Sequence, residues 1–215
     1  MIFVGREVET NQIIQELRRG KNMIVGGKFG IGRTSLIKKI AEVTADERKF
    51  IFIDFSQTPG KMCEKLMKEL GLTLRLKKTG GKMGYKSMRY RIATAEPSTK
   101  KDKPVIVLDN VAKLTPQKII FLRNLLEENR FQFVAIVENF LPPEDFARLR
   151  AQFYPAEVVT LNYLRPEEVF SLIRLYSDQH HFHWPDHYIR KLASIAGRYP
   201  LGIIEMLKKQ AAERS

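Results

Sequence analysis

Short apolar runs alternate, over the first 163 residues, with segments that repeat apolar residues every three or four positions. The runs predict buried strands, and the periodic segments predict amphipathic helices. Strands that alternate with helices imply a parallel sheet with right-handed crossovers. The predicted strands are 22–26, 49–55, 105–109, 131–137 and 157–161. We expect 49–55 to be a central strand, because it is apolar on both sides.

The periodic segments place helices between these strands and also after the last of them. The predicted helices of the first part are 7–19, 32–44, 61–70, 85–95, 115–129 and a short one around Phe146. Beyond Pro166 the pattern predicts helices over 167–180, 186–196 and 201–213, without a strand. We therefore predict an α/β core over 1–163 with an insertion at 74–103, and a small helical domain over 164–215.

A glycine-rich stretch, Gly27 to Thr34, joins the first strand to the helix that follows it. Glycines let successive backbone N–H groups turn toward one centre, and a helix N-terminus adds the positive end of its dipole. The spacing G-x-x-x-x-G-R-T is the P-loop pattern, with Arg33 where lysine is expected. Thr34 would place its hydroxyl on Mg²⁺. A purely structural turn is the alternative interpretation.

Asp109 follows four aliphatic residues, Val105 to Leu108, at the end of a predicted strand. Ligands of open α/β sheets bind at the carboxyl edge of the strands, which is where this carboxylate would lie. A carboxylate at the end of a strand about 75 residues after a P-loop is typical of the residue that helps the P-loop threonine to hold Mg²⁺. We therefore predict that Asp109 acts together with Thr34.

The net charge of +13 is concentrated in the predicted insertion. Ten basic residues face two acidic ones over 74–103, a net +8. Such a field favours polyanions, nucleic acid first. We predict that this segment contacts double-stranded DNA, with Tyr85 and Tyr90 available for stacking; a solvated insertion is the alternative. The proposed DNA-contacting residues are Arg75, Lys77, Lys78, Lys82, Lys86, Arg89 and Arg91.

The composition bears on the size of the core, the redox compartment and membrane contact. The chain has 44% hydrophobic residues, enough to bury a sizeable core. The lone Cys63 excludes an internal disulfide and fits a reducing compartment. The apolar runs are far too short to span a bilayer, and no signal peptide is visible. We expect a cytoplasmic protein that does not contact membranes.

Four motifs make the chain resemble the AAA-type and STAND P-loop ATPases, especially the branch of origin-recognition initiators, archaeal ATPases and transposition regulators. Residues 3–7 (FVGRE) resemble the opening motif of that branch, which lies against adenine. Residues 27–34 resemble Walker A and 105–109 resemble Walker B. Residues 196–201 (AGRYPL) resemble the glycine–proline motif of the helical lid. The order and spacing match over nearly the whole chain.

The resemblance implies that the chain binds ATP or ADP with Mg²⁺. Lys28 stands where partition-type ATPases carry a signature lysine, although a solvated loop lysine is the alternative. The implied nucleotide-binding residues are Val4, Gly5, Gly27, Lys28, Gly30, Ile31, Gly32, Arg33, Thr34, Ser35 and Pro200.

Two departures from the family pattern bear on hydrolysis. Arg33 replaces a lysine that gives a compact ammonium to the phosphates, and arginine is bulkier and planar. Asn110 replaces the glutamate that polarises water, and an amide cannot accept a proton. We expect nucleotide binding to survive and hydrolysis to be slow or absent, so the ATPase assignment stays open.

This pattern leaves several functions open. The first is a nucleotide-dependent switch or assembly factor on DNA. The alternatives are a non-hydrolysing scaffold and a STAND-like regulatory module that binds a protein. The family places a sensor near the γ-phosphate, where Asn139 is either that sensor or a turn residue. Arg148 or Arg150 is either an arginine finger across a homo-oligomer interface or a surface residue. The family's second sensor arginine would fall near Leu201, so this chain lacks it at that position, and Arg198 is a candidate to replace it.

A histidine cluster lies near the C-terminal end. It either holds a metal or forms a turn around a packed tryptophan, Trp184. Pro185 prevents a simple i, i+4 pair of helical ligands, and no cysteine or carboxylate set completes a site. The histidines are His180, His181, His183 and His187.

Overall fold

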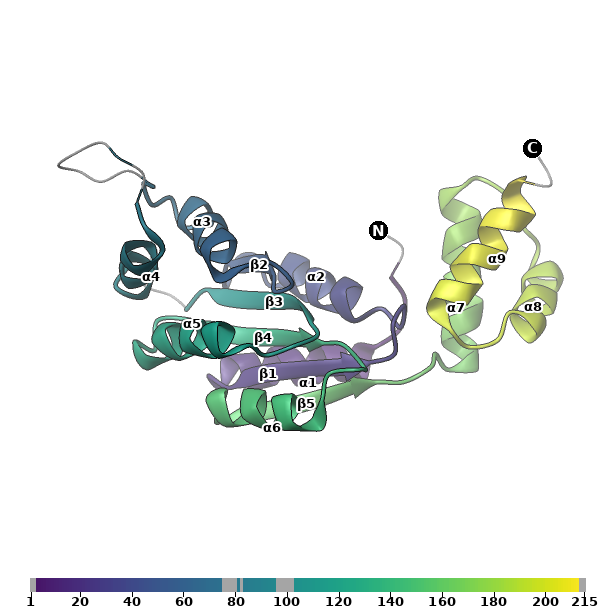
Figure 1. The fold of residues 1–215 in the computed structure, drawn as a ribbon. Helices are drawn as coiled ribbons and strands as arrows, with labels where there is room; N and C mark the ends of the chain where they lie inside the picture. Colours follow the sequence, from purple (N-terminus) through teal and green to yellow (C-terminus); the bar gives the residue numbers. More distant parts are fainter. Residues whose placement is uncertain (1–2, 75–80, 82, 96–102, 213–215) are drawn as a thin grey trace.

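A five-stranded parallel sheet forms the centre of the protein (Figure 1). The computed structural model describes residues 3–74, 81, 83–95 and 103–212. The strand order is β2-β3-β4-β1-β5, so the predicted α/β architecture and the five predicted strands are confirmed. The strands are β1 (Asn22–Gly27), β2 (Phe50–Asp54), β3 (Val105–Val111), β4 (Gln132–Val137) and β5 (Ala156–Leu161).

The expectation that the second strand is central was wrong. β2 lies at one edge of the sheet and pairs only with β3. Ile51 and Ile53 are buried in the core on one face, while Phe50 and Phe52 are half-buried against the other. The strand is apolar on both sides because helices cover both of its faces. This pattern does not depend on how many strands pair with it.

Helices cover the two faces of the sheet as two layers (Figure 1). On one face, α1 and α2 pack through residues such as Ile13 and Ile37. On the other face, α3, α4, α5 and α6 contribute residues such as Leu66, Phe121 and Leu149. The helices are α1 (Glu7–Arg18), α2 (Arg33–Val43), α3 (Pro59–Glu69), α4 (Tyr85–Ala93), α5 (Pro116–Glu127) and α6 (Pro143–Gln152).

Three C-terminal helices stand beyond the carboxyl ends of the strands (Figure 1). They are α7 (Pro166–Gln179), α8 (Asp186–Ile195) and α9 (Pro200–Ala212). They share a hydrophobic cluster of their own, which includes Ile173, Ile189 and Ile203. Within the described residues, no helix is both long and apolar enough to cross a bilayer.

The histidine cluster forms the turn between α7 and α8. Trp184 is buried there, and its backbone N–H donates a hydrogen bond to Ser177 Oγ at 2.9 Å. The rings of Tyr176, His180, Phe182 and Trp184 follow one another at centroid distances of 4.3, 5.8 and 5.0 Å. The packing in this turn therefore follows the tryptophan interpretation. Among the described residues, no group of three or more metal-ligating side chains is arranged to hold a metal.

Candidate nucleotide-binding site

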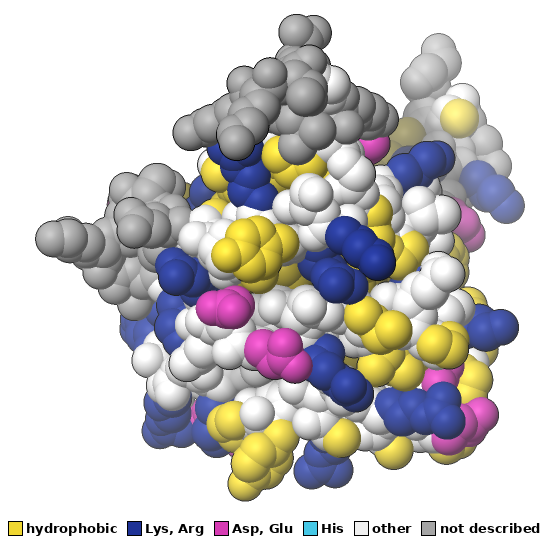
Figure 2. Space-filling view, turned by 60° about the vertical axis from the view of Figure 1, so that its left-hand side comes forward, with side chains coloured by type: hydrophobic (Ala, Val, Ile, Leu, Met, Phe, Trp, Pro, Cys, Tyr) yellow, Lys and Arg dark blue, Asp and Glu magenta, His cyan; other side chains and the backbone are white. Residues whose placement is uncertain are grey.

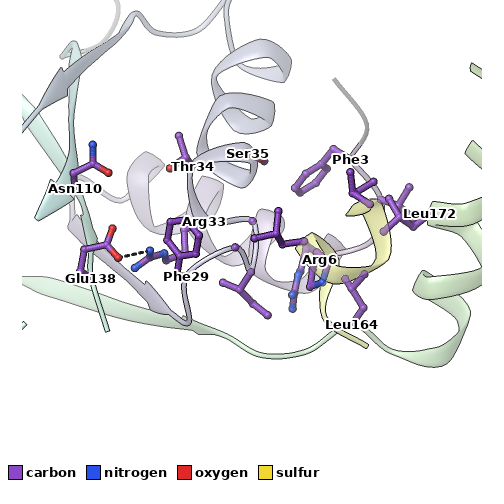
Figure 3. Close-up of a pocket in the computed structure, with 17 residues that line it drawn as sticks. Phe3, Arg6, Phe29, Arg33, Thr34, Ser35, Asn110, Glu138, Leu164 and Leu172 are labelled. Carbon is purple, nitrogen blue, oxygen red and sulfur yellow. Dashed lines mark hydrogen bonds and ion pairs between the residues drawn. The ribbon is translucent and has the colours of Figure 1, made fainter. Parts of the chain in front are cut away.

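A cavity of about 370 Å³ lies between the P-loop and the C-terminal helices (Figure 3). It has the size of ordinary small-molecule sites. Backbone and polar groups of the P-loop line one end, and apolar side chains line the other. The lining residues are Phe3, Val4, Arg6, Phe29, Gly30, Ile31, Gly32, Arg33, Thr34, Ser35, Asn110, Glu138, Leu164, Leu172, Pro200, Leu201 and Ile204.

The P-loop glycines have conformations that other residues rarely adopt. Gly30 has φ 73° and Gly32 has φ 99°, both in the left-handed region. A Cβ at Gly30 would also collide with the Tyr199 hydroxyl and lie 2.8 Å from Leu201 Cβ. These glycines let the loop turn closely before α2, whose N-terminus begins at Arg33. The resulting cradle suits phosphate, because helix N-termini attract anions.

Thr34 and Asp109 meet at the bottom of this cradle. The Thr34 hydroxyl donates to both oxygens of the Asp109 carboxylate, at 3.1 and 3.2 Å. The two residues lie 75 positions apart in the chain. A hydroxyl and a carboxylate are oxygen ligands of the kind that Mg²⁺ prefers. The predicted metal pair is therefore assembled, and its donor set fits the ion.

Arg33 points away from Thr34, toward the end of β4 (Figure 3). Its guanidinium Nη2 lies 2.7 Å from Glu138 Oε2, and Nη1 donates to the carbonyl of Val137. The Arg33 and Glu138 side chains are only 6% and 12% exposed. Glu138 was not among the residues predicted for the site, although its place directly after an apolar strand puts it at the same edge as Asp109. The Arg33 guanidinium is thus paired with a carboxylate.

Asn110 occupies an irregular point of β3. The pairing of β3 with β4 shifts between Leu108 and Val111, and Asn110 has φ 60°. Asparagine tolerates this conformation better than most residues. Its amide nitrogen donates to Asp54 Oδ1 at 3.2 Å. Asn110 therefore lines the cavity while its amide is engaged by the neighbouring strand.

Asp54 is held in its ionised form at the end of β2. Burial alone would raise the pKa of this carboxyl group. Hydrogen bonds from Ser56, Asn110 and Gln57 outweigh that effect and lower its pKa to about 2. The carboxylate consequently remains an acceptor for the Asn110 amide at neutral pH.

The opening motif joins the sheet domain to the C-terminal helices. Gly5 has φ 72°, and a Cβ there would lie 2.7 Å from Glu168 Cγ. The backbone N–H groups of Arg6 and Arg165 donate to the Glu168 carboxylate at 3.2 and 2.6 Å. Burial acts against ionisation of Glu168, but these bonds keep its pKa below the usual value. Val4 of this motif lines the cavity, as does Pro200.

Two tyrosines fasten the P-loop to the C-terminal region. The Tyr199 hydroxyl donates to the carbonyl of Phe29. The Lys28 ammonium donates to the Tyr163 hydroxyl at 2.7 Å and lies 5.0 Å from the centre of its ring. Lys28 is therefore engaged at the rim and does not line the cavity, and neither do Gly5 and Gly27.

The remaining catalytic candidates do not line the cavity. Asn139 is exposed in the turn after β4, where the preceding residue, Glu138, lines the cavity instead. Arg148 is 60% exposed and lies 3.4 Å from Asp145, and Arg150 is exposed on α6. Arg198 Nε donates to the carbonyl of Leu164 at 2.6 Å. Their proposed roles stay predictions.

The described part of the basic segment centres on α4. Lys86 is exposed, and the Arg89 guanidinium lies 5.5 Å from the ring of Tyr85. Tyr90 is 72% exposed. Figure 2 brings this end of the molecule forward, with Lys and Arg side chains spread over the described surface and acidic ones between some of them. Four predicted DNA contacts, Arg75, Lys77, Lys78 and Lys82, lie outside the described residues.

A sequence model of the AAA domain matches residues 16–143, more than half of the chain and the part that contains both Thr34 and Asp109. The chain belongs to the AAA domain family. Membership implies nucleotide binding, typically with Mg²⁺, and the cavity fits such a ligand at its glycine cradle, its Thr34–Asp109 pair and its apolar end. No curated protein sequence matches this AAA chain.

Solved AAA structures share the fold of the whole chain. The Aeropyrum pernix Orc1 protein, solved in complex with DNA, has a TM-score of 0.70 at 13% identity, over 100% of this chain and 62% of that one. The Thermotoga maritima RuvB Holliday junction branch migration motor has a TM-score of 0.64 at 16% identity, over 96% and 61%. A Pyrococcus horikoshii STAND protein has a TM-score of 0.57 at 21% identity, over 94% and 29%. The chain therefore spans at most about three-fifths of these relatives.

Proposed function

We propose that this AAA chain is a nucleotide-dependent switch or assembly factor that acts on DNA, with weak or absent hydrolysis. The observation that carries the proposal is that two consecutive residues, Arg33 and Thr34, have different partners. Thr34 stays paired with Asp109, as magnesium binding requires, whereas Arg33 is paired with Glu138. These contacts support a site that keeps the residues that would hold Mg²⁺, while the residues that would assist phosphoryl transfer depart from the family pattern.

Each part of the cavity has a role in this proposal. The backbone of Gly30 and Gly32 binds phosphate oxygens, and the apolar end with Val4 and Pro200 binds the base. Thr34 and Asp109 hold Mg²⁺, which neutralises charge on the phosphates when it is bound. Asn110 replaces the residue that would polarise water, and its amide already serves Asp54. These contacts support retention of nucleotide and slow turnover.

Charge supports DNA as the partner. The net charge of +13 and the basic residues of α4 favour a polyanion. Tyr90, exposed between Arg89 and Arg91, offers a ring for stacking or hydrogen bonding. The Orc1 relative was solved in complex with DNA, which agrees with this choice of polyanion.

The test combines three measurements on the purified chain. Calorimetric titration with ADP and ATP, with and without Mg²⁺, measures nucleotide binding, and phosphate release measures turnover. Binding to a labelled DNA duplex is then followed with and without Mg-ATP at low and moderate salt. We expect nucleotide binding, little phosphate release, and DNA binding that depends on nucleotide and weakens with salt. Nucleotide binding without any effect on DNA would favour the scaffold alternative, and no nucleotide binding would overturn the proposal.

A further inference from the structure

The place of Glu138 follows from the strand order. β4 lies between β1, which leads into the P-loop, and β3, which carries Asp109. The residue directly after β4 therefore stands between the phosphate cradle and the Thr34–Asp109 pair. If Thr34 and Asp109 hold Mg²⁺ beside the phosphates, the γ-phosphate of a bound triphosphate would lie in this region. Glu138 lines the cavity there.

The charges around that place do not favour a third phosphate. The carboxylates of Glu138 and Asp109 are both present, and the Arg33 guanidinium is already neutralised by Glu138 at 2.7 Å. Lys28, the other cation of the loop, donates to Tyr163 at the rim. A diphosphate needs only the backbone donors of the cradle and Mg²⁺, whereas a γ-phosphate would meet the Glu138 carboxylate.

We propose that the Arg33–Glu138 pair makes this site select a nucleoside diphosphate over the corresponding triphosphate. Glu138 is the specificity-determining residue, because its carboxylate both occupies Arg33 and repels the γ-phosphate. This inference rests on the proposed nucleotide binding. It adds that the diphosphate complex is the resting state of the protein.

The alternative is that Arg33 leaves Glu138 and turns to the γ-phosphate. That movement would break the ion pair and the bond to the Val137 carbonyl, and it would leave a carboxylate that is 12% exposed without its partner. Removing one partner of a buried pair is costly, because the remaining charge is desolvated and uncompensated. The incoming phosphate would add negative charge next to it. The pair is therefore more stable closed, with the diphosphate bound.

The experiment measures the dissociation constants of Mg-ADP and Mg-ATP by calorimetry for the wild-type chain, for Glu138→Gln and for Glu127→Gln. Glu127 is an exposed carboxylate on α5 that does not line the cavity, so it controls for the loss of one negative charge. We expect the wild-type chain to bind ADP about tenfold or more tightly than ATP, because like charges in contact are strongly unfavourable. In Glu138→Gln, ATP binding should tighten until the two constants are nearly equal, while Glu127→Gln keeps the wild-type ratio.

The outcomes separate this inference from the proposed function. If the wild-type chain binds neither nucleotide, the proposed function fails. If it binds both equally, or binds ATP more tightly, nucleotide binding stands and the selection by Glu138 is overturned. The wild-type ratio alone decides this point even if Glu138→Gln does not fold. An unchanged ratio in a folded Glu138→Gln would equally overturn the role of Glu138.

Discussion

Arg33 and Thr34 are neighbours in the chain, yet their side chains reach different regions of the site. Thr34 reaches β3 and meets the carboxylate that the P-loop pattern requires. Arg33 reaches the end of β4 and meets a carboxylate that the pattern does not contain. Under the proposed function, nucleotide binding and turnover would use separable parts of one cradle. An AAA site can keep its metal pair while its cation is diverted.

The largest change in turnover should come from restoring Arg33 and Asn110 to the residue types of the family pattern. Arg33→Lys supplies a compact ammonium that cannot keep both the Glu138 and Val137 contacts, and Asn110→Glu supplies a base. Together they should raise phosphate release by about a hundredfold, the lower range for a positioned general base. The glutamate would stand at φ 60°, where strain of about 1 kcal/mol reduces the gain.

A phosphate-release assay on the single and double variants checks this expectation. Adding Asp109→Asn to the double variant is the control, because it removes the metal pair and should abolish the gain. No change in the double variant would show that Arg33 and Asn110 do not limit turnover.

Removing one partner of the Arg33–Glu138 ion pair should destabilise the fold. Glu138→Gln leaves the buried Arg33 guanidinium uncompensated, so the free energy of unfolding should fall by about 3 kcal/mol without nucleotide. Arg33→Met combined with Glu138→Gln removes both charges and should recover most of that loss. Urea denaturation measures both variants. Equal stabilities of wild type and Glu138→Gln would mean that the ion pair is not formed in solution.

Loss of the Thr34–Asp109 pair should weaken nucleotide binding. Asp109→Ala removes the carboxylate that orients Thr34, so the gain in affinity that Mg²⁺ gives should shrink about tenfold to a hundredfold. Titration of ADP with and without Mg²⁺ measures that gain. Asp178→Ala, at an exposed residue of α7, is the matched control and should change nothing. An undiminished magnesium effect in Asp109→Ala would remove Asp109 from the site.

The basic residues of α4 should contribute to DNA binding as a local group of charges. Reversal of Lys86, Arg89 and Arg91 to Glu should weaken DNA binding about tenfold or more and flatten its salt dependence by about one unit per lost contact. Reversal of Arg190, Lys191 and Lys208, which are exposed on α8 and α9, matches the change in net charge. Equal losses in the two triple variants would assign DNA binding to net charge and not to α4.

The smallest effect concerns Asp54. Its pKa is lowered from 3.8 to about 2, so its hydrogen bonds stabilise the fold above pH 3.8, and that contribution is lost as the pH falls toward 2. Because the side chain is exposed, Asp54→Asn should cost at most about 1 kcal/mol at neutral pH. Thermal unfolding at pH 7 and pH 2 checks this. A difference as large at pH 2 as at pH 7 would contradict the ionised role.

The sequence by itself determined the elements and the positions of the phosphate cradle. Gly30, Gly32 and Thr34 are fixed by local backbone geometry, and the apolar run before Asp109 marks a strand that ends at the ligand edge. Such patterns are readable because they depend on neighbours along the chain. The five strands and the α/β class followed from the same periodicities.

Only the tertiary structure decided the order of the strands and the partners of the charged side chains. Periodicity reports that a strand is covered, which is why the edge position of β2 was missed. The pairing of Arg33 with Glu138 joins residues 105 positions apart. It exists because β4 inserts between β1 and β3, and no local pattern states that order. The identity of Arg33 was plain in the sequence, but its commitment to a carboxylate was decided by the sheet.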